Sequence, residues 1–269
     1  MNNILVRALS GAVFVALVIG SLGYNLYTTV ICIGLFTVLG LIEFYSLFKE
    51  SKTISVSTIM GTFVGFSIFA LFALYFLQLL PQIALVLAFP LLFLSMIAEL
   101  WRMKENPLFN LGVLFLGFIY VVLPFVLMIF IQAKTIESYT VIFMFLLIWT
   151  NDTFAYLTGR WLGKTKLIER ISPNKTWEGT IGGILMTFVI ALVIAYFNDQ
   201  TYLFWVISAA IIAPGAIFGD LLESLFKRSL NIKDTGNIMP GHGGILDRFD
   251  AVLFTVPFFF CWWLFYTYF

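Results

Sequence analysis

Between Asp220 and Asp250 the chain gathers acidic residues, basic residues and its single histidine in an otherwise apolar sequence. Carboxylate oxygens are the ligands that hard divalent cations such as Mg²⁺ prefer, usually together with water and substrate phosphate. Lysine and arginine bind phosphate oxygens through charge-assisted hydrogen bonds. The segment therefore contains the side chains that metal-assisted phosphoryl or nucleotidyl transfer requires.

If the first part of this segment is helical, one of its faces is polar. Two carboxylates, a hydroxyl and an ammonium group follow one another at the spacing i, i+3, i+4 and i+7, namely Asp220, Glu223, Ser224 and Lys227. Positions with this spacing lie on one side of an α-helix. Carboxylates and cations would then line one groove, where a metal ion and a phosphate can meet.

The second part of the segment is a glycine-rich turn that precedes two aspartates. The stretch from Pro240 to Gly244 leaves backbone N–H groups bare, so an anion could approach them closely. Asp247 and Asp250 follow at the spacing i, i+3 and open the last apolar segment. The turn predicts an anion site, and the two aspartates extend the set of candidate metal ligands.

Each of these features also has a structural explanation. An aspartate at a helix start is often only an N-cap. A lone histidine such as His242 is more often a hydrogen-bonded loop residue, and the pair Lys227 and Arg228 is typical of a lipid headgroup contact. The functional interpretation is favoured because so many of these residues occur within one short stretch.

A second polar loop, at about 161–177, adds further candidates. Lys175, close to the start of the next apolar segment, is a plausible anion-binding residue because a helix N-terminus attracts negative charge. Asn174 precedes it, and either Ser172 or Asn174 could cap the next helix. Asp152 lies within the preceding apolar segment, where a structural hydrogen bond to a neighbouring helix is the alternative to metal binding.

The composition indicates that lipid is the solvent for most of this chain. Hydrophobic residues make up 61% of the 269 residues and charged residues only 11%. A soluble domain carries about 25% charged residues. The net charge of +1 gives no indication of a nucleic-acid partner. Cys32 and Cys261 lie in apolar runs and form neither a metal-ligand spacing nor a disulfide framework.

The apolar sequence divides into nine segments, and we expect an all-α, polytopic membrane protein with about nine transmembrane helices. Helices satisfy their backbone hydrogen bonds within lipid, whereas a barrel would need alternating strands. The fifth segment contains Pro124 and is either one kinked span or two short crossings. The segments are roughly 7–22, 28–48, 57–80, 83–100, 108–133, 139–160, 178–197, 201–219 and 249–268.

The basic residues predict the orientation. With the N-terminus in the cytoplasm, only Lys134 of the 15 lysines and arginines falls outside, as the positive-inside rule favours. Splitting the fifth segment would place most basic residues outside, so one kinked or tilted span is preferred.

No cleavage motif follows Arg7, so we expect a retained first helix. Glu43 and Glu99 lie near cytoplasmic helix ends, and simple interfacial placement is an alternative for both.

The same residues resemble the signature of the phosphatidate cytidylyltransferases, also called CDP-diacylglycerol synthases. Met239 is a small departure, since this family usually has another apolar residue there. The stretches from Asn151 to Gly159 and from Ser172 to Gly179 also resemble family motifs, whereas the first 140 residues add only a compatible hydrophobic profile. The signature is carried by Ser224, Lys227, Arg228, Lys233, Asp234, Gly236, Pro240, His242, Gly243, Gly244, Asp247, Arg248, Phe249 and Asp250.

The resemblance implies that CTP and phosphatidate react to CDP-diacylglycerol and pyrophosphate in phospholipid biosynthesis. It also implies Mg²⁺, with a second cation as an option, and a homodimer. We expect a prokaryotic-type cytoplasmic membrane, with the site facing the cytoplasm as the basic residues predict. We expect catalytic roles for Asp220, Asp247, Lys227, Arg228, Lys233 and His242. We expect substrate contacts from Ser224, Asn174, Lys175, Arg248, Gly243 and Gly244, and metal contacts from Asp220, Asp247, Asp250, Glu223 and Asp152.

The expected organisation is a scaffold of N-terminal helices, residues 1–135, and a catalytic region, residues 136–269, with cytoplasmic loops 161–177 and 220–248. Two other functions stay open. One is a related CTP-dependent lipid enzyme, such as a polyprenol kinase or an archaeal-type CDP-lipid synthase. The other is an ion-coupled transporter, which should carry its charges near the bilayer midplane in broken helices rather than at one end.

Overall fold

The fold is helical almost throughout. The computed structural model describes residues 3–51, 53–135, 139–198, 201–232, 235–236, 238 and 243–269, with side chains from residue 9 onward. The chain forms two compact units. Unit 1 comprises Met1–Ile136 and Asp234–Arg248, and unit 2 comprises Glu137–Lys233 and Phe249–Phe269.

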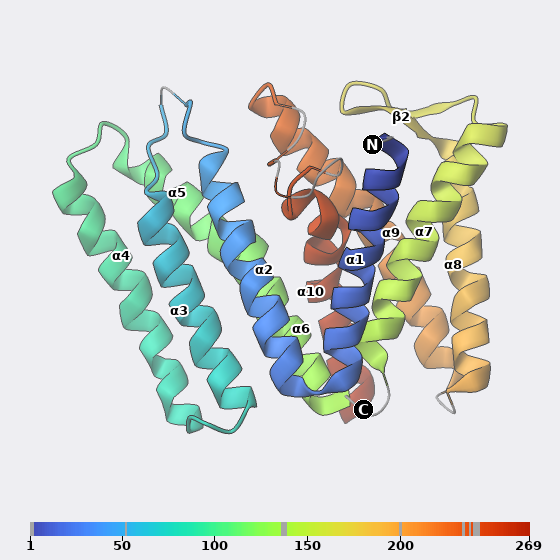
Figure 1. The fold of residues 1–269 in the computed structure, drawn as a ribbon, viewed down its shortest axis with the longest axis horizontal. Helices are drawn as coiled ribbons and strands as arrows, with labels where there is room; N and C mark the ends of the chain where they lie inside the picture. The colour runs from blue at the N-terminus through green and yellow to red at the C-terminus, as the bar shows by residue number, and fades with distance from the viewer. Residues whose placement is uncertain are drawn as a thin grey trace. The chain divides into compact units, whose positions relative to one another are not determined.

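Unit 1 is built from helices that pack against their neighbours in sequence. In Figure 1, α2, α3 and α4 lie side by side, and α1 packs against α2. Asn25 caps α2, because its side chain accepts a hydrogen bond from Thr28 N at 2.9 Å. The elements are α1 (Asn3–Tyr24), α2 (Leu26–Ser46), α3 (Thr58–Phe76), η1 (Gln82–Leu87), α4 (Ala88–Arg102), α5 (Pro107–Gly117), η2 (Phe118–Val122) and α6 (Leu123–Thr135).

The fifth apolar segment is one continuous helical stretch, as predicted from the basic residues. It runs from Pro107 to Thr135 and contains a π-helical turn, η2, which ends at Val122, two residues before Pro124. Proline has no N–H group, and its ring clashes with the carbonyl four residues earlier. A π-turn shifts the hydrogen-bond register and is one of the ways in which a helix absorbs such a defect.

Unit 2 contains four long helices and a small hairpin. Strands β1 and β2 pair antiparallel, with Lys166 opposite Thr176 and Ile168 opposite Ser172. Figure 1 shows this hairpin at the ends of α7 and α8. The elements are α7 (Thr140–Leu162), β1 (Lys166–Ile168), β2 (Ser172–Thr176), α8 (Trp177–Phe197), α9 (Tyr202–Ser229) and α10 (Leu246–Tyr268), whose first three residues belong to unit 1.

Two expectations about the polar loops need correction. The stretch 161–177 is not only a loop, because it contains the β1–β2 hairpin. The loop expected at 220–248 starts later, because α9 continues to Ser229. The hairpin strands are too short and polar to be recognised by apolar periodicity. The stretch from Asp220 to Lys227 is helical, which is the condition under which its polar residues share one face.

The membrane architecture is confirmed. In the described part of the chain, eight helices are long and apolar enough to cross a membrane, and Leu9–Tyr24 is a shorter apolar helix. Each of the nine predicted apolar segments therefore corresponds to a helical segment. The protein is a polytopic, all-α integral membrane protein apart from the hairpin, while the side of the membrane that each end faces stays a prediction.

Helices α7 and α8 approach each other closely through small residues. A Cβ atom on Gly183 would lie 2.7 Å from the carbonyl oxygen of Asn151, and one on Gly179 would lie 2.6 Å from that of Ala155. Small residues at such positions let two membrane helices come into backbone contact. This contact positions the hairpin that joins α7 to α8.

We expect Gly183→Ala to destabilise unit 2, because the backbone of α7 blocks the added methyl group. Overpacking of this kind costs about 1–3 kcal/mol, so the apparent Tm in detergent should fall. Gly112→Ala is the control, since a Cβ there meets no atom within 4 Å. Equal melting of the two variants would contradict the close packing of α7 on α8.

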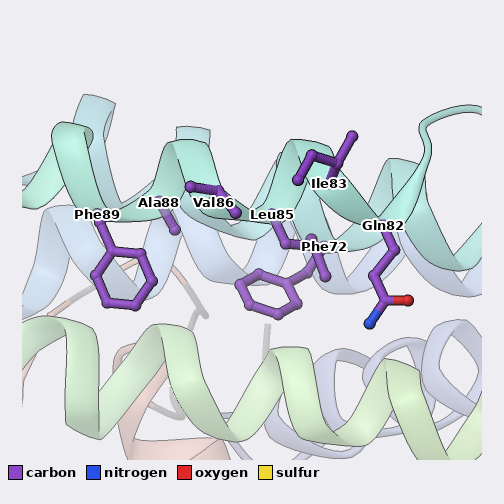
Figure 2. A pocket seen from close by; sticks show the side chains of 7 residues that line it. All are labelled: Phe72, Gln82, Ile83, Leu85, Val86, Ala88 and Phe89. Atoms are coloured by element: carbon purple, nitrogen blue, oxygen red, sulfur yellow. The ribbon is translucent and has the colours of Figure 1, made fainter.

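A groove of about 620 Å³ lies in unit 1 between α3 and the η1–α4 segment. Figure 2 shows Gln82 as the one lining side chain with polar atoms, among rings and aliphatic chains such as those of Phe72 and Phe89. A site without charged groups cannot stabilise phosphates. A phosphate site is therefore expected where charged side chains gather, and not in this groove.

Candidate functional site

Unit 2 brings four of the predicted metal-binding carboxylates into electrostatic range of one another. Asp250 on α10 interacts with Glu223 and Asp220 on α9 and with Asp152 on α7. The two helices α9 and α10 are in close contact, since a Cβ on Gly219 would lie 2.6 Å from the carbonyl oxygen of Asp250. We refer to Asp152, Asp220, Glu223 and Asp250 as the acid cluster.

Two lysines pair with the acid cluster. Lys175 Nζ on β2 lies 2.6 Å from Asp220 Oδ2, and Lys227 Nζ lies 2.8 Å from Glu223 Oε2. Ser224 Oγ donates to Asp220 Oδ1 at 3.2 Å. In the described part of the chain, these ion pairs join two of the four carboxylates to ammonium groups. A cluster of carboxylates suits a divalent cation or further cationic groups.

The members of the acid cluster differ in exposure. Glu223 is buried, with 2% of its surface exposed, whereas the side chain of Asp220 is 36% exposed. A buried carboxylate needs a partner, and Lys227 supplies one for Glu223. Asp220 is accessible, so its pair with Lys175 can exchange for contacts with a metal ion or a substrate.

The residues fit Mg²⁺ in one particular way. Among the described residues, no three His, Cys, Asp or Glu side chains are arranged closely enough to hold a metal ion by themselves. Mg²⁺ is commonly held by one or two carboxylates, and water and substrate phosphates complete its shell. The acid cluster therefore fits a cation that is held together with substrate, rather than one held in a closed cage.

The β1–β2 hairpin positions Lys175 through contacts at its base. Glu178 accepts hydrogen bonds from Lys164 N at 3.1 Å and from Thr165 N at 3.2 Å. Thr176 caps α8, and its Oγ1 accepts from Gly179 N at 3.2 Å. These bonds join the hairpin to the first turn of α8. Lys175 therefore extends from an anchored strand, and the predicted residue Asn174 is exposed beside it.

Unit 1 contains a second polar cluster, at the base of the predicted glycine-rich turn. Asp247 Oδ2 accepts hydrogen bonds from Thr235 N at 3.0 Å, Thr235 Oγ1 at 2.9 Å and Gly244 N at 2.8 Å. Gly243 has a φ of 81°, which only glycine adopts freely, and a Cβ there would lie 2.5 Å from Asp247 Oδ2. The glycine-rich turn was predicted to bind an anion through its backbone N–H groups. In the structure, the Gly244 N–H donates to the carboxylate of Asp247.

Glu43 was not among the predicted site residues, although it belongs to this cluster. This residue of α2 is 4% exposed, and its Oε2 accepts a hydrogen bond from Leu246 N at 2.9 Å. Its place in an apolar helix was the available signal, because intramembrane carboxylates are costly. Thr235 was also missed, since a threonine in a polar loop carries no signal of its own. We refer to Glu43, Thr235, Gly244 and Asp247 as the loop-base cluster.

Glu99, the other carboxylate near a predicted helix end, belongs to a separate network in unit 1. It lies 2.5 Å from Arg102 Nη1 and accepts from Asn110 Nδ2 at 2.7 Å. Asn110 Oδ1 in turn accepts from Ser55 N at 2.7 Å. Because these groups satisfy one another's hydrogen bonds, the contacts of Glu99 indicate a structural role, and interfacial placement stays an alternative for it.

The remaining predicted residues lie at the edges of these clusters or outside the described part of the chain. Arg228 Nη1 donates to the carbonyl oxygen of Ile232 at 3.5 Å. Arg248 is half-buried in the first turn of α10. Lys233 and His242 lie outside the described residues, so their predicted roles stay predictions.

Comparison with known proteins identifies relatives over most of the chain. Residues 5–267 match the profile of the family described as the cytidylyltransferase family. A phosphatidate cytidylyltransferase of Rickettsia typhi is 36% identical over 222 residues, which cover 79% of this chain and 92% of the relative. One from Rickettsia bellii is 38% identical over 61% of this chain and 73% of the relative. One from Staphylococcus aureus is 43% identical over 48% of this chain and 51% of the relative.

Proposed function

Because this chain belongs to the cytidylyltransferase family, we propose that it transfers CMP from CTP to phosphatidate and releases pyrophosphate. Membership makes the chain a nucleotidyltransferase, and the relatives named phosphatidate cytidylyltransferase support the lipid substrate. The product would be CDP-diacylglycerol, a precursor in phospholipid biosynthesis. The observation that carries this proposal is the acid cluster with its two lysines in a membrane protein of this family.

The reaction requires charge control more than proton transfer. An oxygen of the phosphatidate phosphate attacks the α-phosphorus of CTP, and the bond from that phosphorus to the bridging oxygen of the β-phosphate breaks. The attacking oxygen is already anionic near neutral pH, so no strong base is needed. The site has to hold two anions in line and reduce their repulsion.

Different described residues would supply these functions. Lys175 and Lys227 are the cations that would bind phosphate oxygens, with Arg228 nearby in sequence. Asp220 and Asp250 would hold Mg²⁺, with Glu223 and Asp152 in support. Bound Mg²⁺ would neutralise phosphate charge and align the reacting groups. Asp247 holds the loop base together through Oδ2, and we propose that the same carboxylate also contacts metal or substrate.

The proposal also covers the oligomeric state, the membrane and the orientation of the site. We propose a homodimer in the cytoplasmic membrane of a bacterium, with the site facing the cytoplasm, where CTP is available. The bacterial relatives support the membrane, and the distribution of lysine and arginine supports the orientation. A cysteine probe in the 161–177 loop should label from the cytoplasmic side in whole cells, and labelling from outside would overturn the orientation.

The decisive experiment incubates the purified protein in detergent with CTP labelled in the α-phosphate, phosphatidate and Mg²⁺. We expect labelled CDP-diacylglycerol and unlabelled pyrophosphate. Parallel reactions replace phosphatidate with a polyprenol or with an archaeal-type ether lipid phosphate. Formation of CDP in place of pyrophosphate would indicate a kinase. No product with any of these lipids over a range of divalent ions would overturn the proposal.

Lys175→Gln should raise the KM for CTP by about tenfold, the usual effect of losing one charged hydrogen bond. The reason is that Lys175 is held beside the acid cluster on an anchored strand. Lys164→Gln is the matched control, because it removes the same charge next to the hairpin from a residue whose backbone, not its side chain, makes the described contact. An equal KM in the two variants would remove Lys175 from the CTP site.

A further inference from the structure

Glu43 makes a contact that links two distant parts of unit 1. It stands in the last turn of α2, and its Oε2 accepts the N–H of Leu246, which is 203 positions away in sequence. Leu246 is the first residue of α10, where backbone N–H groups have no partner within the helix. A carboxylate is favourable there because the N-terminus of a helix carries partial positive charge. Glu43 thus caps α10 from another helix.

Two glycines of the loop are packed directly against this carboxylate. A Cβ on Gly236 would lie 2.7 Å from Glu43 Oε1, and one on Gly244 would lie 2.5 Å from Glu43 Oε2. Neither glycine has a positive φ among the described backbone angles, so conformational freedom does not explain them. The space that Glu43 occupies explains Gly236, and Glu43 together with Thr235 Oγ1, which would also lie 2.5 Å from a Cβ, explains Gly244.

Glu43 and Asp247 contact the backbone at Gly244 from two sides. Gly244 donates its N–H to Asp247 Oδ2 at 2.8 Å, while its Cα faces Glu43. The two carboxylates carry like charge and lie within electrostatic range of each other. Their repulsion is offset because separate backbone N–H groups compensate each of them, those of Leu246 and of Gly244 and Thr235.

We propose that Glu43 is a positioning residue of the enzyme, which fixes the start of α10 and thereby the orientation of Asp247. The inference rests on the proposed function in one respect, namely that Asp247 serves the transfer reaction. Glu43 is 4% exposed and touches the loop through its carboxylate, so it acts through Asp247 and needs no contact with substrate. Loss of this support should misplace reacting groups, and displacements of about 1 Å can cost 100-fold in rate.

The first test compares Glu43→Ala with Glu43→Gln. Alanine removes the acceptor for Leu246 N, so kcat should fall about 10- to 100-fold. Glutamine keeps an amide oxygen at the same reach and should restore most of the rate. Tyr45→Phe is the control on the same helix, since it removes a buried hydrogen bond to Leu114 O, at 2.9 Å, away from the loop. Its kcat should stay close to that of the unchanged protein.

Hydrogen exchange supplies a readout that needs no activity. In Glu43→Ala, the amides of 243–248 should exchange about fivefold faster or more, as expected for one lost hydrogen bond. Exchange in α3 and α5 should not change. If the unchanged protein makes no CDP-diacylglycerol, the proposed function fails, yet this measurement still tests whether Glu43 holds the loop base.

A double-mutant cycle tests the direct contact. Gly236→Ala should push the Glu43 carboxylate away and reproduce the loss of rate seen in Glu43→Ala. The double variant should be no worse than either single variant, because both remove the same interaction. Gly236→Ala with normal rate and normal exchange would overturn the contact.

Two other results would overturn the positioning role. One is a kcat in Glu43→Ala within about twofold of the unchanged protein, since an effect that small is within ordinary surface variation. The other is a Glu43→Gln variant as slow as Glu43→Ala with unchanged exchange at 243–248. That result would show that the charge of Glu43 acts on the substrates directly.

Discussion

Asp220→Asn should lower kcat/KM for CTP by about 100- to 1,000-fold, the range seen when one electrostatic group of a reaction site is removed. Asparagine has the volume of aspartate and can still accept the hydrogen bond from Ser224 Oγ. What it removes is the negative charge, which now pairs with Lys175 at 2.6 Å and would face Mg²⁺ during the reaction. The effect therefore reports on charge rather than on packing.

The measurement is steady-state turnover at increasing Mg²⁺ concentration. If Asp220 holds the metal, Asp220→Asn should need more Mg²⁺ for half-maximal rate. Ser224→Ala is the matched control, because it removes only the hydrogen bond to Asp220 Oδ1 and should cost a few-fold at most. Near-normal turnover of a folded Asp220→Asn protein would remove this residue from the metal site.

The helices could be predicted because lipid imposes a simple rule. Runs of apolar residues must form helices in hydrocarbon, and charges mark their ends. The π-turn at η2 could not be predicted beyond a kink near Pro124, because several local distortions absorb a proline equally well. The β1–β2 hairpin was missed because its strands are short and polar and are held by side chains from α8, such as Glu178.

In the site, contacts within one helix could be predicted from the sequence, whereas contacts between distant segments could not. The pairs Ser224 with Asp220 and Lys227 with Glu223 follow from helical spacing alone, and the structure contains both. The pair of Lys175 with Asp220 joins a strand to a helix far along the chain, so no periodicity indicates it. The contact of Glu43 with Leu246 depends on how α2 packs in unit 1, which a single sequence does not specify.

Asp247→Asn should lower kcat by about 100- to 1,000-fold and should also loosen the loop base, unlike Asp220→Asn. Three donors converge on Asp247 Oδ2. An asparagine oxygen can meet them, but without the charge these bonds become weaker. Its amide group also replaces one carboxylate oxygen, which weakens any contact of this side chain with a metal or a substrate.

Two measurements separate the loosening of the loop base from the loss of a contact with metal or substrate. Faster exchange of the Thr235 and Gly244 amides reports on the loop, and the Mg²⁺ dependence of the rate reports on the reacting groups. Thr235→Val is the matched control, because it removes one of the three donors and keeps the backbone N–H and the side-chain shape. It should loosen the loop slightly and cost about fivefold in rate. If Thr235→Val and Asp247→Asn lose rate equally, Asp247 only supports the loop, and the carboxylates of the acid cluster carry the reaction without it.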